Sequence, residues 1–160
     1  MTAVDASARG RMSRRKGATG ERDVAKWIRP WYPDARRAVF NGWTSTTGSA
    51  LDPGDIDCTS PGLFWSVKNT QVEQINPWLA ELSVKCGGRI GLLVVKRKGH
   101  ASPGEWWCWL RAADLRSLMV GSDLGEFVLP ELEVGAAPVR MELQHVLPLL
   151  VGANYAKAAA

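Results

Sequence analysis

Residues 53–68 read PGDIDCTSPGLFWSVK, and this stretch carries the strongest structural pattern in the chain. Two short strands are predicted, at 55–58 and 63–68, because a turn-forming Thr-Ser-Pro-Gly segment lies between them. Side chains alternate across a strand, so apolar Trp65 and Val67 are expected on the core face. Ser66 and Lys68 then project together from the other face.

The elements expected around this stretch alternate between helix and strand. A helix is predicted at 77–86, with Asn76 as its N-cap and Gly87-Gly88 as its end. Further helices are expected at 19–29 and 112–119, and further strands at 38–40, 89–96, 105–110, 126–129 and 139–143. This order predicts an α/β or α+β domain, with a central mixed β-sheet flanked by helices.

Length and composition exclude several classes of protein. The 160 residues suffice for one domain of ordinary size. Apolar residues make up 46% and charged residues 22%, which is typical of a globular chain. No apolar run approaches the ~20 residues that a membrane helix needs, and the N-terminus has no apolar signal segment. Three cysteines without a C-x-x-C pair favour a reducing cytoplasm over a disulfide framework or zinc cluster. We expect no membrane and no small-molecule cofactor.

Positive charge is concentrated at the N-terminal end. Residues 1–40 hold ten basic and four acidic side chains, whereas the remaining residues hold ten and twelve. Such an imbalance favours a polyanionic partner, most simply nucleic acid. Residues 1–13 lack apolar periodicity and are predicted to form a flexible basic arm.

The polar residues of the first stretch indicate a specific chemistry. Asp55 begins one predicted strand, and Lys68 ends the next. A carboxylate can hold a hard divalent cation, while a neighbouring lysine can orient a water and stabilise charge developing on a phosphate. The pair therefore predicts hydrolysis of a phosphodiester bond.

Four short motifs resemble those of the PD-(D/E)xK nuclease superfamily, and within it the archaeal-type Holliday-junction resolvases and their phage relatives. The motifs are KGATGER at 16–22, GDID at 54–57, SVKN at 66–69 and the WLAE helix at 78–81. The resemblance covers roughly residues 14–119. It implies a restriction-endonuclease-like fold, a nuclease domain over 14–119, a Mg²⁺ cofactor for which Mn²⁺ can substitute, and a homodimer. Residues 120–160 would form a C-terminal extension of unassigned role, packed on the same domain.

One departure from the family pattern affects the metal site. The glutamate of the family's Glu-x-Lys strand is Ser66 here. Some restriction enzymes in the superfamily likewise have Ser-x-Lys and take the missing carboxylate from the next helix. Glu81 lies on that helix and is preferred over Glu73, because a rigid element positions a ligand better than a connecting segment.

The resemblance implies a role for each candidate residue. The catalytic set is Glu21, Asp55, Ser66, Lys68 and Glu81, and the metal-ligand candidates are Asp55, Glu81, Glu21 and Asp57. Contacts to DNA are expected from basic and hydroxyl-bearing side chains and one glutamine, namely Arg14, Arg15, Lys16, Arg22, Ser45, Thr46, Ser49, Gln71, Lys96 and Lys98.

These residues together predict a divalent-metal-dependent endonuclease that resolves four-way junctions or other branched double-stranded DNA. Two alternatives remain open from the sequence. One is a related nuclease that acts on forks, flaps or duplex DNA. The other is a non-catalytic DNA-binding module that lost its metal site together with the glutamate at position 66.

Overall fold

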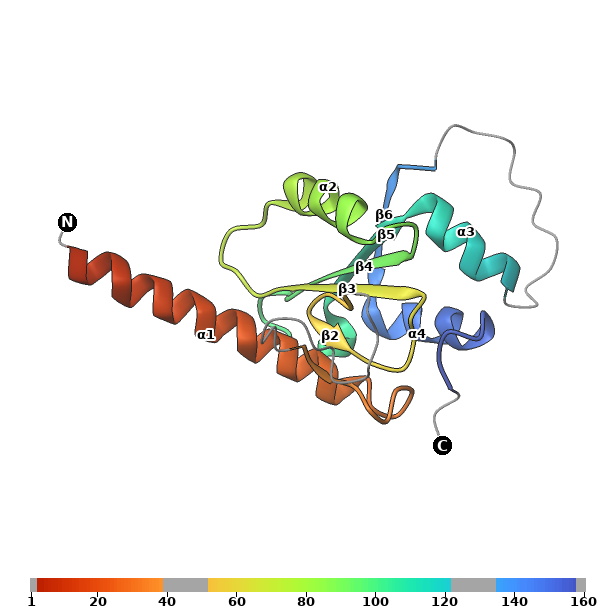
Figure 1. The fold of residues 1–160 in the computed structure, drawn as a ribbon, viewed down its shortest axis with the longest axis horizontal. Coiled ribbons are helices and arrows are strands. Elements are labelled where there is room, and N and C mark those ends of the chain that lie inside the picture. The colour runs from red at the N-terminus through yellow and green to blue at the C-terminus, as the bar shows by residue number, and fades with distance from the viewer. Residues whose placement is uncertain (1–2, 39–51, 122–134, 158–160) are drawn as a thin grey trace.

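The structure, a computed structural model, describes residues 3–38, 52–121 and 135–157 (Figure 1). The described chain is α+β. Its elements in order are α1 (Ala3–Trp27), β1 (Arg36–Arg37), β2 (Ile56–Asp57), β3 (Leu63–Lys68), α2 (Ile75–Lys85), β4 (Ile90–Val95), the 3-10 helix η1 (Pro103–Glu105), β5 (Trp107–Arg111), α3 (Ala112–Gly121), β6 (Pro138–Glu142) and α4 (Leu143–Gly152).

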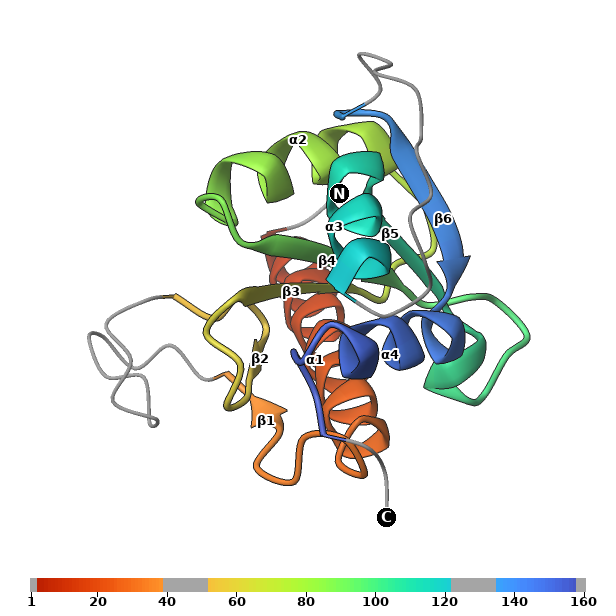
Figure 2. The ribbon, with the colours of Figure 1, turned by 90° about the vertical axis from the view of Figure 1, so that its right-hand side faces the viewer.

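A mixed sheet forms the centre of the described fold, as the sequence predicted. Its four strands lie in the order β3-β4-β5-β6, and β1 pairs with β2 in a separate antiparallel ribbon. β3 and β4 are parallel, because α2 connects them as a crossover, whereas the other pairs of the sheet are antiparallel. α1 and α2 lie on opposite sides of β3 and β4 (Figures 1 and 2).

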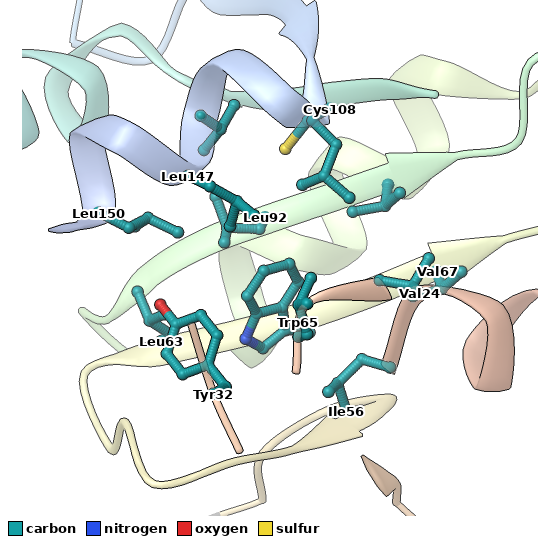
Figure 3. Packing of buried hydrophobic residues seen from close by; sticks show 14 of the residues in the cluster. Val24, Tyr32, Ile56, Leu63, Trp65, Val67, Leu92, Cys108, Leu147 and Leu150 are labelled. Atoms are coloured by element: carbon teal, nitrogen blue, oxygen red, sulfur yellow. The ribbon is translucent and has the colours of Figure 1, made fainter. Parts of the chain in front are cut away.

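One face of the sheet packs into a large apolar core. Trp65 is 1% exposed and lies edge-to-face against Tyr32, with 6.2 Å between the ring centroids. Val24 of α1 and Leu147 of α4 belong to the same cluster (Figure 3). The alternation predicted for β3 is therefore confirmed on its core side.

The opposite face carries a smaller apolar cluster beneath α2. Phe64 of β3 packs there with Leu82 of α2 and Leu93 of β4. Because side chains alternate, Ser66 and Lys68 lie on this α2-side face and are half-buried. The two faces of β3 thus separate an apolar core from a polar surface.

The first helix is much longer than predicted. It begins at Ala3 rather than near Thr19, and it includes most of the segment that was expected to be a flexible arm. Residues 11–16 are all exposed, and this part of α1 extends beyond the rest of the described fold (Figure 1). The prediction was wrong because it relied on apolar periodicity, whereas this segment consists largely of residues with good intrinsic helix propensity.

Two further boundaries differ from the prediction. The N-cap of α2 is Gln74, without a side-chain cap hydrogen bond, so the assignment of Asn76 was wrong. The predicted strand at 38–40 is replaced by β1 two residues earlier, and its end lies outside the described residues, as does the predicted strand at 126–129.

The C-terminal helix α4 was not predicted, because Pro148 lies inside it. Proline removes one backbone donor and usually disfavours a helix interior. Here Leu143, Val146, Leu147 and Leu150 follow the helical spacing and are all buried in the large core. Burial of this apolar stripe outweighs the cost of one proline.

Candidate functional site

A close backbone contact positions Asp55 beside β3. The Asp55 amide donates to the Trp65 carbonyl over 2.7 Å, and the Trp65 amide donates to the Pro53 carbonyl over 3.2 Å. Gly54 bridges the two segments with φ at +82°, and an added Cβ would overlap the Trp65 carbonyl oxygen. Only glycine suits both this conformation and this contact.

The Asp55 carboxylate faces the edge of β3. Its Oδ2 accepts a 2.6 Å hydrogen bond from the Val67 amide. Burial is the main cause that raises the pKa of Asp55, and the negative charge of Glu21 raises it further. The Val67 amide, Lys68 and Lys85 oppose that rise. Asp55 is thus a half-buried acid in electrostatic contact with a second carboxylate and two lysines.

Lys68 and Glu81 meet across β3 and α2. Lys68 Nζ lies 3.9 Å from Glu81 Oε2, and Lys85 Nζ lies 2.6 Å from Glu81 Oε1. The hydrogen bond from Lys85 is the largest cause of the lowered Glu81 pKa, and it raises the pKa of Lys85 in return. Sequence analysis did not single out Lys85, although its spacing of four residues from Glu81 was a usable signal.

Glu21 approaches the same region from α1, and Arg37 forms an ion pair with it. The helix is held there by Asn69, whose side-chain amide donates to the Lys16 carbonyl over 2.8 Å. A Cβ on Gly20 would lie 2.9 Å from the Asn69 Cβ, so a glycine permits this approach. Neither Arg37 nor Asn69 was predicted to belong to the site.

The remaining metal candidates lie in different surroundings. Asp57 is 3% exposed, and its Oδ2 pairs with Arg36 Nη2 at 3.1 Å. Ser66 shares the α2-side face with Lys68. Glu73 is exposed in the segment before α2, whereas Glu81 lies within that helix and contacts Lys68.

The predicted DNA contacts fall in three places. Arg14, Arg15, Lys16 and Arg22 are exposed along α1, and Gln71 is exposed after β3. Lys96 lies over the Trp106 ring at 4.9 Å, and Lys98 is exposed nearby. Ser45, Thr46 and Ser49 lie outside the described residues.

The described part of the chain contains no cluster of three or more histidine, cysteine or acidic side chains arranged to hold a metal ion. Its acidic groups near Lys68 pair instead with basic side chains, Glu81 with Lys85 and Glu21 with Arg37. All three cysteines are free thiols. The described helices include none with the length and hydropathy that crossing a membrane requires.

Comparisons of the chain with protein-family models, with curated proteins and with solved structures find no match. The arrangement of Asp55, Lys68, Glu81 and Glu21 is therefore the evidence from which a function is inferred.

Proposed function

We propose that the chain is a divalent-metal-dependent endonuclease of restriction-endonuclease-like fold that cleaves branched DNA, with four-way junctions as the preferred substrate. The observation that carries this proposal is the contact between Lys68 at the end of β3 and Glu81 on α2, beside the half-buried carboxylate of Asp55. The predicted strands and helix thus bring an acid, a lysine and a helix carboxylate to one place.

Carboxylate oxygens of the kind found at this place are ligands that Mg²⁺ accepts. The ion prefers oxygen ligands, keeps several waters and commonly uses only one or two protein carboxylates together with substrate phosphates. Asp55 and Glu81 would supply these carboxylates, and Glu21 would assist from α1. The charge of Glu21 already disfavours ionised Asp55, and a bound cation relieves that cost. Held by these carboxylates, the ion would supply Lewis-acid stabilisation of charge on a phosphate and would make water a better nucleophile.

Lys68 would position the attacking water and the phosphate. Its ammonium group carries donors that can orient an attacking water and interact with a phosphate oxygen as negative charge develops there. The side chain is half-buried, so its field is less screened than that of a surface lysine. Ser66 projects from the same face and offers a hydroxyl to the same region.

The test uses purified protein with an end-labelled synthetic four-way junction, a fork and a linear duplex, each with Mg²⁺, with Mn²⁺ or with EDTA. Paired symmetric nicks in the junction that disappear in EDTA are the expected result. If forks or duplex alone were cleaved, the proposed nuclease activity would stand, but the proposed junction preference would be wrong.

Two pairs of variants separate chemistry from folding. Asp55→Asn and Lys68→Ala should each lose cleavage, by about 100-fold or more. Their matched controls are Asp34→Asn, which keeps an acceptor for Thr59, and Lys26→Ala, an exposed lysine in the last turn of α1. Full activity in both site variants would contradict the proposal, as would equal loss in the controls.

A non-catalytic DNA-binding module remains the second candidate. The observation that favours it is the pairing of Glu81 with Lys85 and Lys68, which uses a carboxylate that would otherwise bind metal. Titration with Mn²⁺ distinguishes the two candidates. A functional site should bind the ion and lose that binding in Asp55→Asn, whereas a degenerate site should bind DNA and no metal.

A symmetric junction cut also requires two sites, so the active nuclease should be a homodimer.

A further inference from the structure

A cluster of arginines and tryptophans lies on the same sheet face as the candidate site. Arg97, which follows β4, lies over the Trp107 ring at 4.3 Å. Arg140 of β6 lies over the same ring at 4.5 Å and over the Trp109 ring at 5.5 Å. We call Arg97, Trp107, Trp109 and Arg140 the Arg-Trp cluster.

Strand register connects this cluster with the candidate site. Lys68 pairs with Val95, Val95 with Trp107, and Trp107 with Glu142. Directly paired residues share a sheet face, so Lys68 and Trp107 project from the same side, two strands apart. Strand spacing places their backbones about 10 Å from each other. A nucleic-acid strand whose phosphate lies at Lys68 can therefore continue across the cluster.

The charge of the cluster suits a polyanion. Arg140 is exposed and forms no ion pair with an acidic side chain among the described residues. Arg97 pairs with Glu142 at 3.0 Å, and Glu142 also accepts a hydrogen bond from Gln144 at 2.7 Å. Exposed Lys98 follows Arg97 in the chain. Within the described residues, the positive charge of Arg140 is thus not neutralised by an acidic side chain.

The tryptophans favour a single strand over a duplex. Trp107 and Trp109 are two residues apart on one strand face and are half-buried, so their Cα atoms are spaced by about 7 Å. That is roughly twice the 3.4 Å base spacing along each strand of a duplex, so successive stacked bases of a duplex do not match it. An unpaired strand can extend until its bases reach this spacing. Aromatic rings and arginine planes together are the usual contact surface for unpaired bases.

We infer that the Arg-Trp cluster binds a single-stranded DNA segment next to the cleavage site. This inference deepens the proposed function and rests on it for the site, because it requires the branched substrate to open at its branch point and present unpaired bases beside the scissile phosphate. Trp107 holds the two guanidinium groups in place, and the guanidinium groups contact phosphates and bases.

The test measures fluorescence anisotropy of a labelled 12-nucleotide single strand and of a duplex of equal length, in EDTA. Arg140→Gln is compared with Arg116→Gln, an exposed arginine on α3. Arg140→Gln should weaken single-strand binding about tenfold, whereas Arg116→Gln should change it by less than about twofold. In the double variant Arg97→Gln/Arg140→Gln, the slope of log K against log salt should fall by about 1.4.

The results of these binding measurements either support or overturn single-strand binding by the Arg-Trp cluster. Equal effects of Arg140→Gln and Arg116→Gln would overturn the inference, and so would an equal loss of duplex binding. If Arg140→Gln changed the protein from a dimer to a monomer without loss of DNA binding, the cluster would be a subunit interface. That result would also overturn the inference. Because binding is measured in EDTA, a selective single-strand effect would support the inference even if no metal restored cleavage. Cleavage by the wild type with no effect of Arg140→Gln would retain the nuclease and reject this surface.

Discussion

The two faces of the four-stranded sheet differ in what their side chains do. The face covered by α1 and α4 packs into the larger core, where Trp65, Val67 and Leu92 are almost fully buried. The α2-side face has only five buried members in its cluster, and beside them lie Lys68 and Arg140. Charged side chains are costly to bury but useful near a polyanion. Stability is thus concentrated on one face, and Lys68 and Arg140 lie on the other.

The largest expected effect comes from the core face. Trp65→Ala should lower the free energy of unfolding by about 3–5 kcal/mol, since a large buried side chain is removed and a cavity remains. Trp78→Ala provides the matched change in the smaller cluster, where the ring is half-buried, and should cost less than half as much. Urea denaturation monitored by far-UV circular dichroism measures both. Equal losses would contradict the division of the sheet into two unequal faces.

The next largest effect on stability is expected at Gly54, where the backbone before β2 contacts β3. Gly54→Ala should cost about 3 kcal/mol, because a left-handed conformation and overlap with the Trp65 carbonyl act together. Gly88→Ala is the matched control, with φ at +83° and no atom within 4 Å of its added Cβ. It should cost only about 1 kcal/mol. Thermal denaturation measures both losses of stability. The difference between them is the contribution of the close backbone contact that positions Asp55.

Asp55 allows a test in which stability and activity change in opposite directions. Burial raises the pKa of Asp55 in the folded protein above its ordinary value of 3.8, so the folded state favours the protonated acid. Stability from this group is therefore present below pH 3.8 and declines as pH rises through the higher folded pKa. At neutral pH, Asp55→Asn should unfold at a higher urea concentration than the wild type, while cleavage is lost.

The same comparison at low pH is the control for this prediction. Below the ordinary pKa the wild-type carboxyl is protonated in both states, so the stability advantage of Asp55→Asn should disappear. The Val67 amide retains an acceptor in the variant, because asparagine carries a side-chain oxygen. A variant less stable than the wild type at every pH would show that the ionised carboxylate stabilises the fold.

Sequence analysis found much of this arrangement for a clear physical reason. β3 alternates between apolar and polar residues from Trp65 to Lys68, and β4 is a continuous apolar run, so local pattern alone predicted both strands and the face on which Lys68 lies. Local pattern could not predict α4, because burial of its apolar stripe compensates for Pro148 only after the core has formed.

The candidate site shows the same limit of sequence reasoning. Asp55, Lys68 and Glu81 were identified from short motifs, and the structure places Glu81 next to Lys68. Arg37, Lys85 and Asn69 were missed as partners of these groups. Arg37 and Asn69 are sixteen and fifty-three residues from their partners, so no local pattern connects them. Long-range pairing of this kind depends on how α1 and β1 pack, which neither propensity nor periodicity encodes.

The smallest expected effect comes from the ion pair on α2. The Glu81 side chain is 43% exposed and that of Lys85 is 54% exposed, so solvent screens their interaction. Lys85→Gln and Glu81→Gln should each lower the free energy of unfolding by less than about 0.5 kcal/mol. A double-mutant cycle by urea denaturation measures the coupling, and a value above about 1 kcal/mol would contradict this estimate.

Activity should separate these two variants although stability does not. If Glu81 supplies the carboxylate that Ser66 lacks, Glu81→Gln should weaken Mn²⁺ binding and reduce cleavage, whereas Lys85→Gln should retain both. Removal of Lys85 also releases Glu81 from its shortest ion pair, at 2.6 Å, and so favours metal binding. Equal metal affinity in both variants would show that Glu81 is only a surface charge. The candidate site would then rely on Asp55 and Glu21, and the ligand role proposed for α2 would be wrong.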